Sequence, residues 1–394
     1  MAESKIEWTE HVWNPVRGCS IISPGCKNCY AMRDAARKNS NPKVPSYKGF
    51  AIFNDRHEPH WTGKVELIPE QLEIPLRRRK PTRYFVNSMS DLFHESLPDE
   101  AIDRVFAVMA LCPQHTFQVL TKRAERMQDY FDIPGYRQEM IGIEAEKRSG
   151  LSRWQDAGCG ASSMRATWIL PFSNVWLGVS CENQQYANER IPLLLQTPAA
   201  VRFVSAEPLL GAIDLGGAVG CGYYCDERVG HVDHAFWTRG IKSPIDWVIV
   251  GGESGPDARP MHPDWARSIR DQCVAAKVPF FFKQWGEWAP KSHGHRVKNN
   301  TRDWGTHDGK ELFPTAMPWN GHDDDGSGEA VLIRVGKVNA GRLLDGRTWD
   351  KMPGHSVAAN STVVERESVI LKHSGDAQQK RAVSAKERQE NPTE

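Results

Sequence analysis

Seven short apolar segments, each followed by polar residues, constrain the fold of this chain more than any other feature. Apolar residues at helical spacing occupy three stretches between them, at 99–112, 186–196 and 262–276. Near-continuous apolarity is typical of strands covered on both faces of a parallel sheet, and alternating helices indicate right-handed crossovers. The expected strands are HVWNPVRG (11–18), RYFVNSMSD (83–91), TFQVLTKR (116–123), NVWLGVSCEN (174–183), VRFVSAEP (201–208), DWVIVGGESG (246–255) and PFFFKQWGEW (279–288).

These segments predict an α/β fold, a partial parallel (β/α) barrel of about six to seven strands, fewer than the eight of a full barrel. The barrel domain is expected at 1–290, with irregular insertions at about 134–173 and 211–244 that lack clear periodicity. A C-terminal extension follows at 291–353, and the polar composition of 354–394 predicts a disordered tail. Because ligands of such folds bind at the carboxyl ends of the strands, we expect one site built from many loops.

The charge balance excludes a protein that recruits nucleic acid or membranes through its overall field, since 50 Lys and Arg face 49 Asp and Glu. The N-terminus, MAESKIEWTEHVWN, lacks the basic and apolar regions of a signal peptide. No apolar run approaches the roughly 20 residues that span a bilayer. We therefore expect a cytoplasmic protein with no membrane partner, whose nine cysteines stay reduced.

Three of those cysteines, Cys19, Cys26 and Cys29, lie together in the loop GCSIISPGCKNCYA, and no fourth follows nearby. A loop rich in glycine and proline is a poor place for buried core thiols. Structural zinc needs a closed tetrahedral shell, so it would require a fourth ligand such as His11 or a distant cysteine. A [4Fe–4S] cluster held by three thiolates instead leaves one iron open to an exogenous ligand. The residues alone leave both metal readings open.

Three clustered cysteines after the first strand of a partial barrel resemble the radical S-adenosylmethionine superfamily. The resemblance implies that the open iron chelates the amino and carboxylate groups of S-adenosylmethionine, and that reductive cleavage yields a 5′-deoxyadenosyl radical. It also implies a reducing electron donor such as a flavodoxin or ferredoxin. The spacing departs from the common C-x-x-x-C-x-x-C pattern, because six residues separate Cys19 from Cys26.

A closer resemblance is to a bacteriophage-associated family of uncharacterised radical-SAM-like proteins. It covers most of residues 6–353, although not the two insertions in detail, and it does not supply a reaction. The matching stretches are IEWTEHVWNPVRGCSIISPGCKNCYA (6–31), RYFVNSMSDLFHE (83–95), FQVLTKR (117–123), WLGVSCEN (176–183), RFVSAEPLLG (202–211), WVIVGGESG (247–255), FFKQWGEW (281–288) and AGRLLDGRTWDKMP (340–353).

Polar residues at the predicted strand ends are the candidates for cofactor binding. Ser88, Ser90 and Asp91 could accept hydrogen bonds from the methionine ammonium, with a helix N-cap as the alternative. Carboxylates after later strands could bind a ribose hydroxyl, adenine or substrate, and a glycine pair would let a ligand approach the backbone unless it only forms a turn. These residues are Glu182, Glu207, Gly251, Gly252 and Glu253.

Four further polar residues could hold a carboxylate or phosphate, with surface salt bridges as the alternative. They are Lys122, Arg123, Lys283 and Gln284. A second metal site is conceivable in the later insertion, where the spacing of two cysteines and two histidines resembles a structural zinc module, although a metal-free loop is favoured. Its four residues are Cys221, Cys225, His231 and His234.

The run LRRRKPTR (76–83), with Arg77, Arg78, Arg79 and Lys80, could contact phosphates, or could be a solvated loop. We therefore expect a radical S-adenosylmethionine enzyme of unknown substrate, with a nucleic-acid base as the first candidate, and no catalytic residue can be named. Three rivals remain: a zinc-binding scaffold, a nucleic-acid-binding protein with structural cysteines, and a non-radical enzyme whose cluster is structural.

Overall fold

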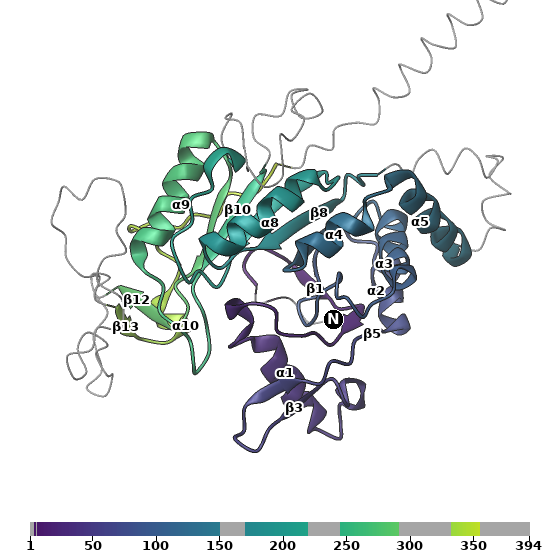
Figure 1. Cartoon of the computed structure of the whole chain (residues 1–394), viewed down its shortest axis with the longest axis horizontal. Coiled ribbons are helices and arrows are strands. Elements are labelled where there is room, and N and C mark those ends of the chain that lie inside the picture. Colours follow the sequence, from purple (N-terminus) through teal and green to yellow (C-terminus); the bar gives the residue numbers. More distant parts are fainter. Residues whose placement is uncertain (1–3, 5, 150–169, 220–244, 291–331, 355–394) are drawn as a thin grey trace, which may run out of the picture. The chain divides into compact units, whose positions relative to one another are not determined.

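Seven parallel strands form the central sheet of the computed structural model, which describes residues 4, 6–149, 170–219, 245–290 and 332–354 (Figure 1). Strand order across the sheet follows chain order, as expected when each crossover returns to the next position. The sheet is a half-barrel, which confirms the predicted fold class. In order, its strands are β1 (His11–Trp13), β6 (Arg83–Val86), β7 (Thr116–Thr121), β8 (Val175–Ser180), β9 (Val201–Ala206), β10 (Trp247–Gly251) and β11 (Phe280–Gln284).

Most helices lie between these strands along the chain and bury apolar residues in the main core beside the sheet. The helices expected near 99–112, 186–196 and 262–276 all form, with bounds that differ by a residue or two. Asn183 caps the second of them by accepting a hydrogen bond from the Tyr186 N–H. The helices are α1 (Tyr30–Asn39), α2 (Glu73–Arg77), α3 (Asp99–Leu111), α4 (Ala124–Tyr130), α5 (Pro134–Ser149), α8 (Gln184–Gln196), α9 (Pro263–Ala276) and α10 (Lys337–Ala340).

The strands are mostly apolar because successive side chains enter two different cores. In β10, Val248 and Val250 pack against the helices, whereas Trp247 and Ile249 belong to a second cluster on the opposite face. Aromatic residues from five segments meet there. Four rings have centroids within about 6 Å of the Trp247 ring centroid, namely those of Trp8, Trp176, Phe203 and Phe281. Gly178 makes room for this cluster, since a Cβ atom at that position would lie 2.6 Å from the Phe203 ring.

The last described segment closes the free edge of the half-barrel beside β11. Asp350 forms an antiparallel bridge with Phe281, and the Trp349 carbonyl accepts from the Phe282 N–H at 2.8 Å. The Lys351 carbonyl accepts from the Trp247 indole at 2.9 Å. The described part of the predicted extension therefore packs directly on the barrel.

Within the described residues, three two-stranded sheets lie outside the main sheet. β2 (Val16–Arg17) pairs with β5 (Glu66–Leu67), β3 (Ala51–Phe53) with β4 (Pro59–Trp61), and β12 (Trp288–Pro290) with β13 (Leu332–Arg334), all antiparallel. The β3–β4 hairpin packs against α1 through a small apolar cluster that includes Ala35, Ala36 and Ala51.

The two insertions differ in part from the prediction. The first half of the 134–173 stretch is not irregular, because α5 occupies Pro134–Ser149 and buries Ile141 and Ala145 against the core. Its apolar pattern is weak because Arg137 and Gly142 share the buried face with those two residues. Much of the 211–244 insertion, with the four candidate zinc ligands, and nearly all of the 354–394 tail lie outside the described residues. No helix in the described ranges is long and apolar enough to cross a membrane.

Candidate functional site

The three cysteines follow the carboxyl end of β1, in the loop that leads into α1. A short 3-10 turn, Pro24–Cys26, precedes Cys29, and Cys29 directly precedes the first residue of α1. All three thiols are free and partly buried. Because every strand of the sheet is parallel, the residues after β6, β7, β8, β9 and β10 share this edge.

The three thiols interact with one another electrostatically. Burial raises the pKa of Cys19 to about 12, the Asp91 charge and the other two thiols add to the rise, and Arg123 opposes it. Burial likewise raises the pKa of Cys29, and Cys26 contributes. Such buried sulfurs ionise only with a nearby cation or metal, so the donor set is one that a metal or cluster would complete.

Among the described residues, no three His, Cys, Asp or Glu side chains surround a position suited to a single metal ion. A single ion, as in a tetrahedral zinc site, needs ligands that converge on one point. A [4Fe–4S] cluster binds each thiolate through a different iron, so its ligands stand farther apart. The chemistry of three sulfur donors therefore fits the cluster reading.

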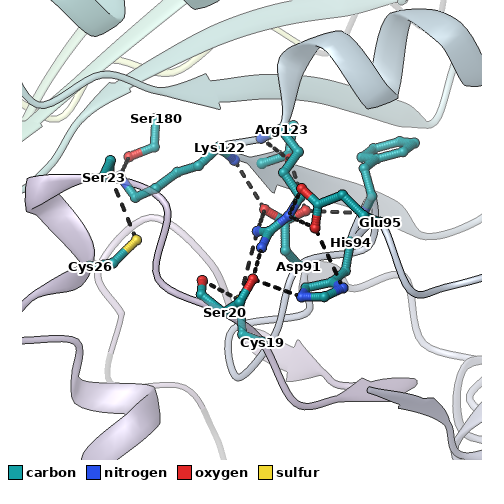
Figure 2. A network of polar contacts seen from close by, with 12 residues as sticks. Cys19, Ser20, Ser23, Cys26, Asp91, His94, Glu95, Lys122, Arg123 and Ser180 are labelled. Atoms are coloured by element: carbon teal, nitrogen blue, oxygen red, sulfur yellow. Dashed lines mark hydrogen bonds and ion pairs between the residues drawn. The ribbon is translucent and has the colours of Figure 1, made fainter. Parts of the chain in front are cut away.

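Asp91 is the centre of a buried network beside Cys19 (Figure 2). Its Oδ1 accepts from the Thr121 hydroxyl at 2.7 Å and the Phe93 N–H at 3.0 Å. Its Oδ2 accepts from the Lys122 N–H at 3.1 Å and Arg123 at 3.2 Å. Four donors match the four lone-pair sites of a carboxylate, so none remains for the methionine ammonium expected from the sequence.

Arg123 connects this network to the cysteine loop. Its guanidinium bonds Glu95 at 2.8 and 2.9 Å, the Ser20 hydroxyl at 2.7 Å, and Sγ of Cys19 at 3.8 Å (Figure 2). Ser20 in turn lies 2.9 Å from His94. Although burial lowers the pKa of Arg123, Asp91 and Cys19 outweigh it and raise the pKa above its ordinary value. A permanent positive charge therefore stands beside the first cysteine.

Glu182, after β8, holds the middle of the cysteine loop. The side chain is fully buried, and it accepts from the Gly25 N–H at 3.2 Å, from Lys122 at 3.2 Å and from Arg190 at 3.0 Å. Burial alone would raise the pKa of Glu182, but Lys122, Ser23 and Arg190 outweigh it and lower the pKa. A Cβ atom at Gly25 would lie 3.1 Å from Glu182 and Lys122, so glycine allows this approach.

Glu253, after β10, holds the end of the loop in the same way. It accepts from the Asn28 amide at 3.1 Å and from Arg259 through three contacts of 2.6 to 2.8 Å. Arg259 also donates to the Pro24 carbonyl at 3.0 Å, and Asn28 to the Asp257 carbonyl at 2.6 Å. The structure thus uses Glu253 as an anchor for the cysteine loop.

Glu207 is the predicted carboxylate with the fewest partners. Its hydrogen bond in the described structure is from the Lys283 ammonium, at 2.6 Å. The two side chains are 18% and 13% exposed, so the pair reaches solvent at the carboxyl edge. A Cβ atom at Gly251 would lie 3.1 Å from Glu207, so glycine keeps the space beside the pair open. Glu207 can therefore still accept a hydrogen bond from a ligand, and Lys283 can still donate one to it.

The remaining predicted residues have structural contacts. The Ser88 hydroxyl bonds Asn14, and the Ser90 hydroxyl bonds the Val16 carbonyl. A Cβ atom at Gly252 would lie 1.9 Å from the Trp285 carbonyl, so close backbone packing requires glycine there. The Gln284 amide donates to Ser254 at 3.1 Å, and its buried carbonyl oxygen has no hydrogen-bond partner in the described structure.

The basic run lies at the opposite end of the sheet from the cysteines. It spans the end of α2 and the turn before β6, so it precedes the amino end of that strand. Arg78 is tied to the Thr82 hydroxyl at 2.6 Å, while Arg77, Arg79 and Lys80 are exposed. The run therefore does not border the cysteine site.

Several residues of the site carry little signal in the sequence. Asn28, Arg190 and Arg259 join the site only because folding brings distant segments together. A charged residue on the buried face of a predicted helix, as Arg190 is in α8, was the one available clue.

A family model described as "Protein of unknown function (DUF5131)" matches residues 3–353. The chain belongs to the DUF5131 family. The matched range includes every described residue of the site and ends where the compact unit Met1–Pro353 ends. Comparisons with curated proteins and with solved structures gave no significant match. Membership of DUF5131 thus identifies the family without identifying an activity.

Proposed function

We propose that this protein is a radical S-adenosylmethionine enzyme whose [4Fe–4S] cluster binds to Cys19, Cys26 and Cys29. The observation that supports this most is the position of the three free thiols, in one loop at the carboxyl edge of a parallel half-barrel. Ligands of such folds bind at that edge.

The second support is the set of hydrogen bonds that anchors the loop. Three buried carboxylates, Asp91, Glu182 and Glu253, fix it from β6, β8 and β10, through Arg123, Gly25 and Asn28. A site that must hold a reactive group in one geometry needs such outer contacts. A loop that served only as a connection would not need three buried charges to hold it.

Once bound, such a cluster supplies the electron for reductive cleavage of S-adenosylmethionine. The chain contributes positioning and charge. Arg123 donates toward the Cys19 sulfur, and Lys283 offers an ammonium to a carboxylate. Glu207 offers free acceptor sites to a ribose hydroxyl or an ammonium. The proposal includes a small reducing protein such as a flavodoxin or ferredoxin as the electron source, and a nucleic-acid base as the substrate class.

Anaerobic purification with iron and sulfide analysis tests the cluster. We expect about four irons and four sulfides per chain, and loss of the brown colour in Cys19→Ala, Cys26→Ala and Cys29→Ala. Cys112→Ala and Cys273→Ala are the controls, because both thiols are buried in the main core. Zinc without iron or sulfide in the wild-type protein would contradict the proposal and favour the zinc-binding scaffold.

A further inference from the structure

One segment concentrates positive charge beside the cysteines. Residues 27–64, here called the arm, contain α1 and the β3–β4 hairpin. The arm has eight Lys or Arg and three Asp or Glu, a net charge of +5, whereas the whole chain has +1. The rest of the chain is therefore slightly acidic, and the arm is an electrostatic exception.

Most of this charge is not neutralised within the fold. Of the acidic residues, Asp34 pairs with Lys38 at 2.6 Å and Glu58 bonds Asn54 at 2.9 Å. Five exposed cations of the arm have no ion pair with any described residue. They are Lys27, Arg37, Lys43, Lys48 and Arg56. Uncompensated cations on one small unit attract a polyanion.

The tip of the hairpin is held by side-chain hydrogen bonds and presents an aromatic ring. The Asn54 side chain accepts from the N–H groups of Arg56 and Glu58, at 3.0 and 2.8 Å. His57 is exposed and has a φ of 59°, in the left-handed region that favours glycine. Its ring stacks on Phe53, with the centroids 4.5 Å apart and the planes 6° from parallel. The outer face of such a ring can stack on a base.

Direct contacts attach the arm to the candidate site. Arg33 of α1 pairs with Asp257 at 2.6 Å. Asp257 lies in the loop after β10, and its carbonyl also accepts a hydrogen bond from the Asn28 amide. The Tyr30 hydroxyl donates to the Ser88 carbonyl at 2.7 Å, in the loop after β6. Tyr30 directly follows Cys29, so a polymer on the arm would run past the mouth of the site.

From this charge, stacking surface and position, we infer that the arm binds a nucleic-acid strand. The exposed cations contact its phosphates, and the His57–Phe53 stack takes a base. Binding of the strand needs no cluster and is independent of the proposed function. Only the further step, that a base of this strand is the substrate, rests on the proposed function.

A salt series on three forms of the full chain tests the inference. Fluorescence anisotropy with labelled single-stranded DNA and RNA is measured for the wild type and for two triple variants. The arm variant is Lys43→Ser, Lys48→Ser and Arg56→Ser. The control variant, Arg77→Ser, Arg79→Ser and Lys80→Ser, removes three exposed charges at the other end of the sheet. Both triples change the net charge equally.

The arm variant should bind more weakly and lower the slope of log K against log salt by about two units, since each phosphate contact of a single strand contributes roughly 0.7. The control variant should keep the wild-type slope. In a separate variant, His57→Ala should weaken binding about tenfold with little change in slope, because base stacking is worth roughly 1–3 kcal/mol. Equal slopes in both triples would overturn the inference, as would absence of wild-type binding at low salt.

Anionic phospholipid vesicles are the second probe. Wild-type binding to vesicles without binding to either nucleic acid would overturn the inference in favour of a membrane surface. Each measurement is made with and without iron reconstitution. Loss of nucleic-acid binding with an intact cluster would remove only this inference, and loss of the cluster with binding retained would remove only the proposed function.

Discussion

Arg123 places a guanidinium nitrogen 3.8 Å from the sulfur of Cys19. Asp91 and Glu95 hold that guanidinium in place. Hydrogen bonds and positive charge near a cluster sulfur stabilise the reduced, more negative state. This contact therefore relates the buried network to the reduction potential of the proposed cluster.

Replacing Arg123 by Met should make the reduction potential of the cluster more negative, because a positive charge and a donor are lost. Arg123→Lys keeps the charge, so its reduction potential should lie between those of Arg123→Met and the wild type. A redox titration followed by electron paramagnetic resonance measures the effect. Arg104→Met, which changes a half-exposed arginine paired with Glu144, is the control. An unchanged potential in loaded Arg123→Met would contradict this role.

Glu207→Gln and Lys283→Met should weaken S-adenosylmethionine binding while leaving the iron content unchanged. Loss of one charge-assisted hydrogen bond is worth on the order of 1.5–3 kcal/mol, so the affinity should fall about tenfold or more. Calorimetric titration of anaerobically loaded protein provides the measurement. Wild-type affinity in both variants would place the cofactor elsewhere on this edge.

Asp91→Asn should have a different effect from those two variants. The amide cannot pair with Arg123 as a charge, so the loop around Cys19 should loosen and a buried guanidinium should be left uncompensated. We expect a loss of about 3 kcal/mol or more in the free energy of unfolding, and a lower iron content. Normal stability with a selective loss of S-adenosylmethionine affinity would instead support direct contact with the ammonium.

The acid stability of the iron-free protein should depend on Glu182. Its pKa in the folded state lies below the ordinary value of 4.5, because Lys122 and Arg190 outweigh the burial that would raise it. When a carboxyl has a lower pKa in the folded state than in the unfolded state, its ionised form stabilises the fold. This contribution is complete at pH values above the unfolded-state pKa and is lost as the pH falls through the folded-state pKa. The free energy of unfolding of the wild type should therefore exceed that of Glu182→Gln by its full amount at pH 7, and this difference should shrink below about pH 4.5. Urea unfolding across that range checks it, and a constant difference would contradict the pairing.

The sheet could be predicted from the sequence because its strands are buried on both faces. The strand Trp247–Gly251, for example, has no polar side chain, since Val248 faces the helices and Trp247 faces the aromatic cluster. The helix α5 escaped prediction because its buried face combines Ile141 and Ala145 with Arg137 and Gly142, so a charged residue and a glycine interrupt the apolar pattern. Periodicity reports such a helix weakly.

The site was predicted in part. Strand-end position correctly brought Asp91, Glu182, Glu207 and Glu253 to one edge of the sheet. It could not show which of them are saturated, because their donors, such as Arg190 and Asn28, come from segments that only the fold brings near. Hydrogen-bond saturation is a property of three-dimensional packing, and the sequence order of the residues does not contain it.

Reductive cleavage of S-adenosylmethionine tests the central claim most directly. Anaerobically loaded protein is mixed with dithionite and S-adenosylmethionine, and 5′-deoxyadenosine and methionine are quantified by liquid chromatography. The account predicts both products with wild-type and Cys112→Ala protein, and neither with Cys19→Ala, Cys26→Ala or Cys29→Ala. An intact [4Fe–4S] cluster that yields no 5′-deoxyadenosine in the wild-type protein would contradict it.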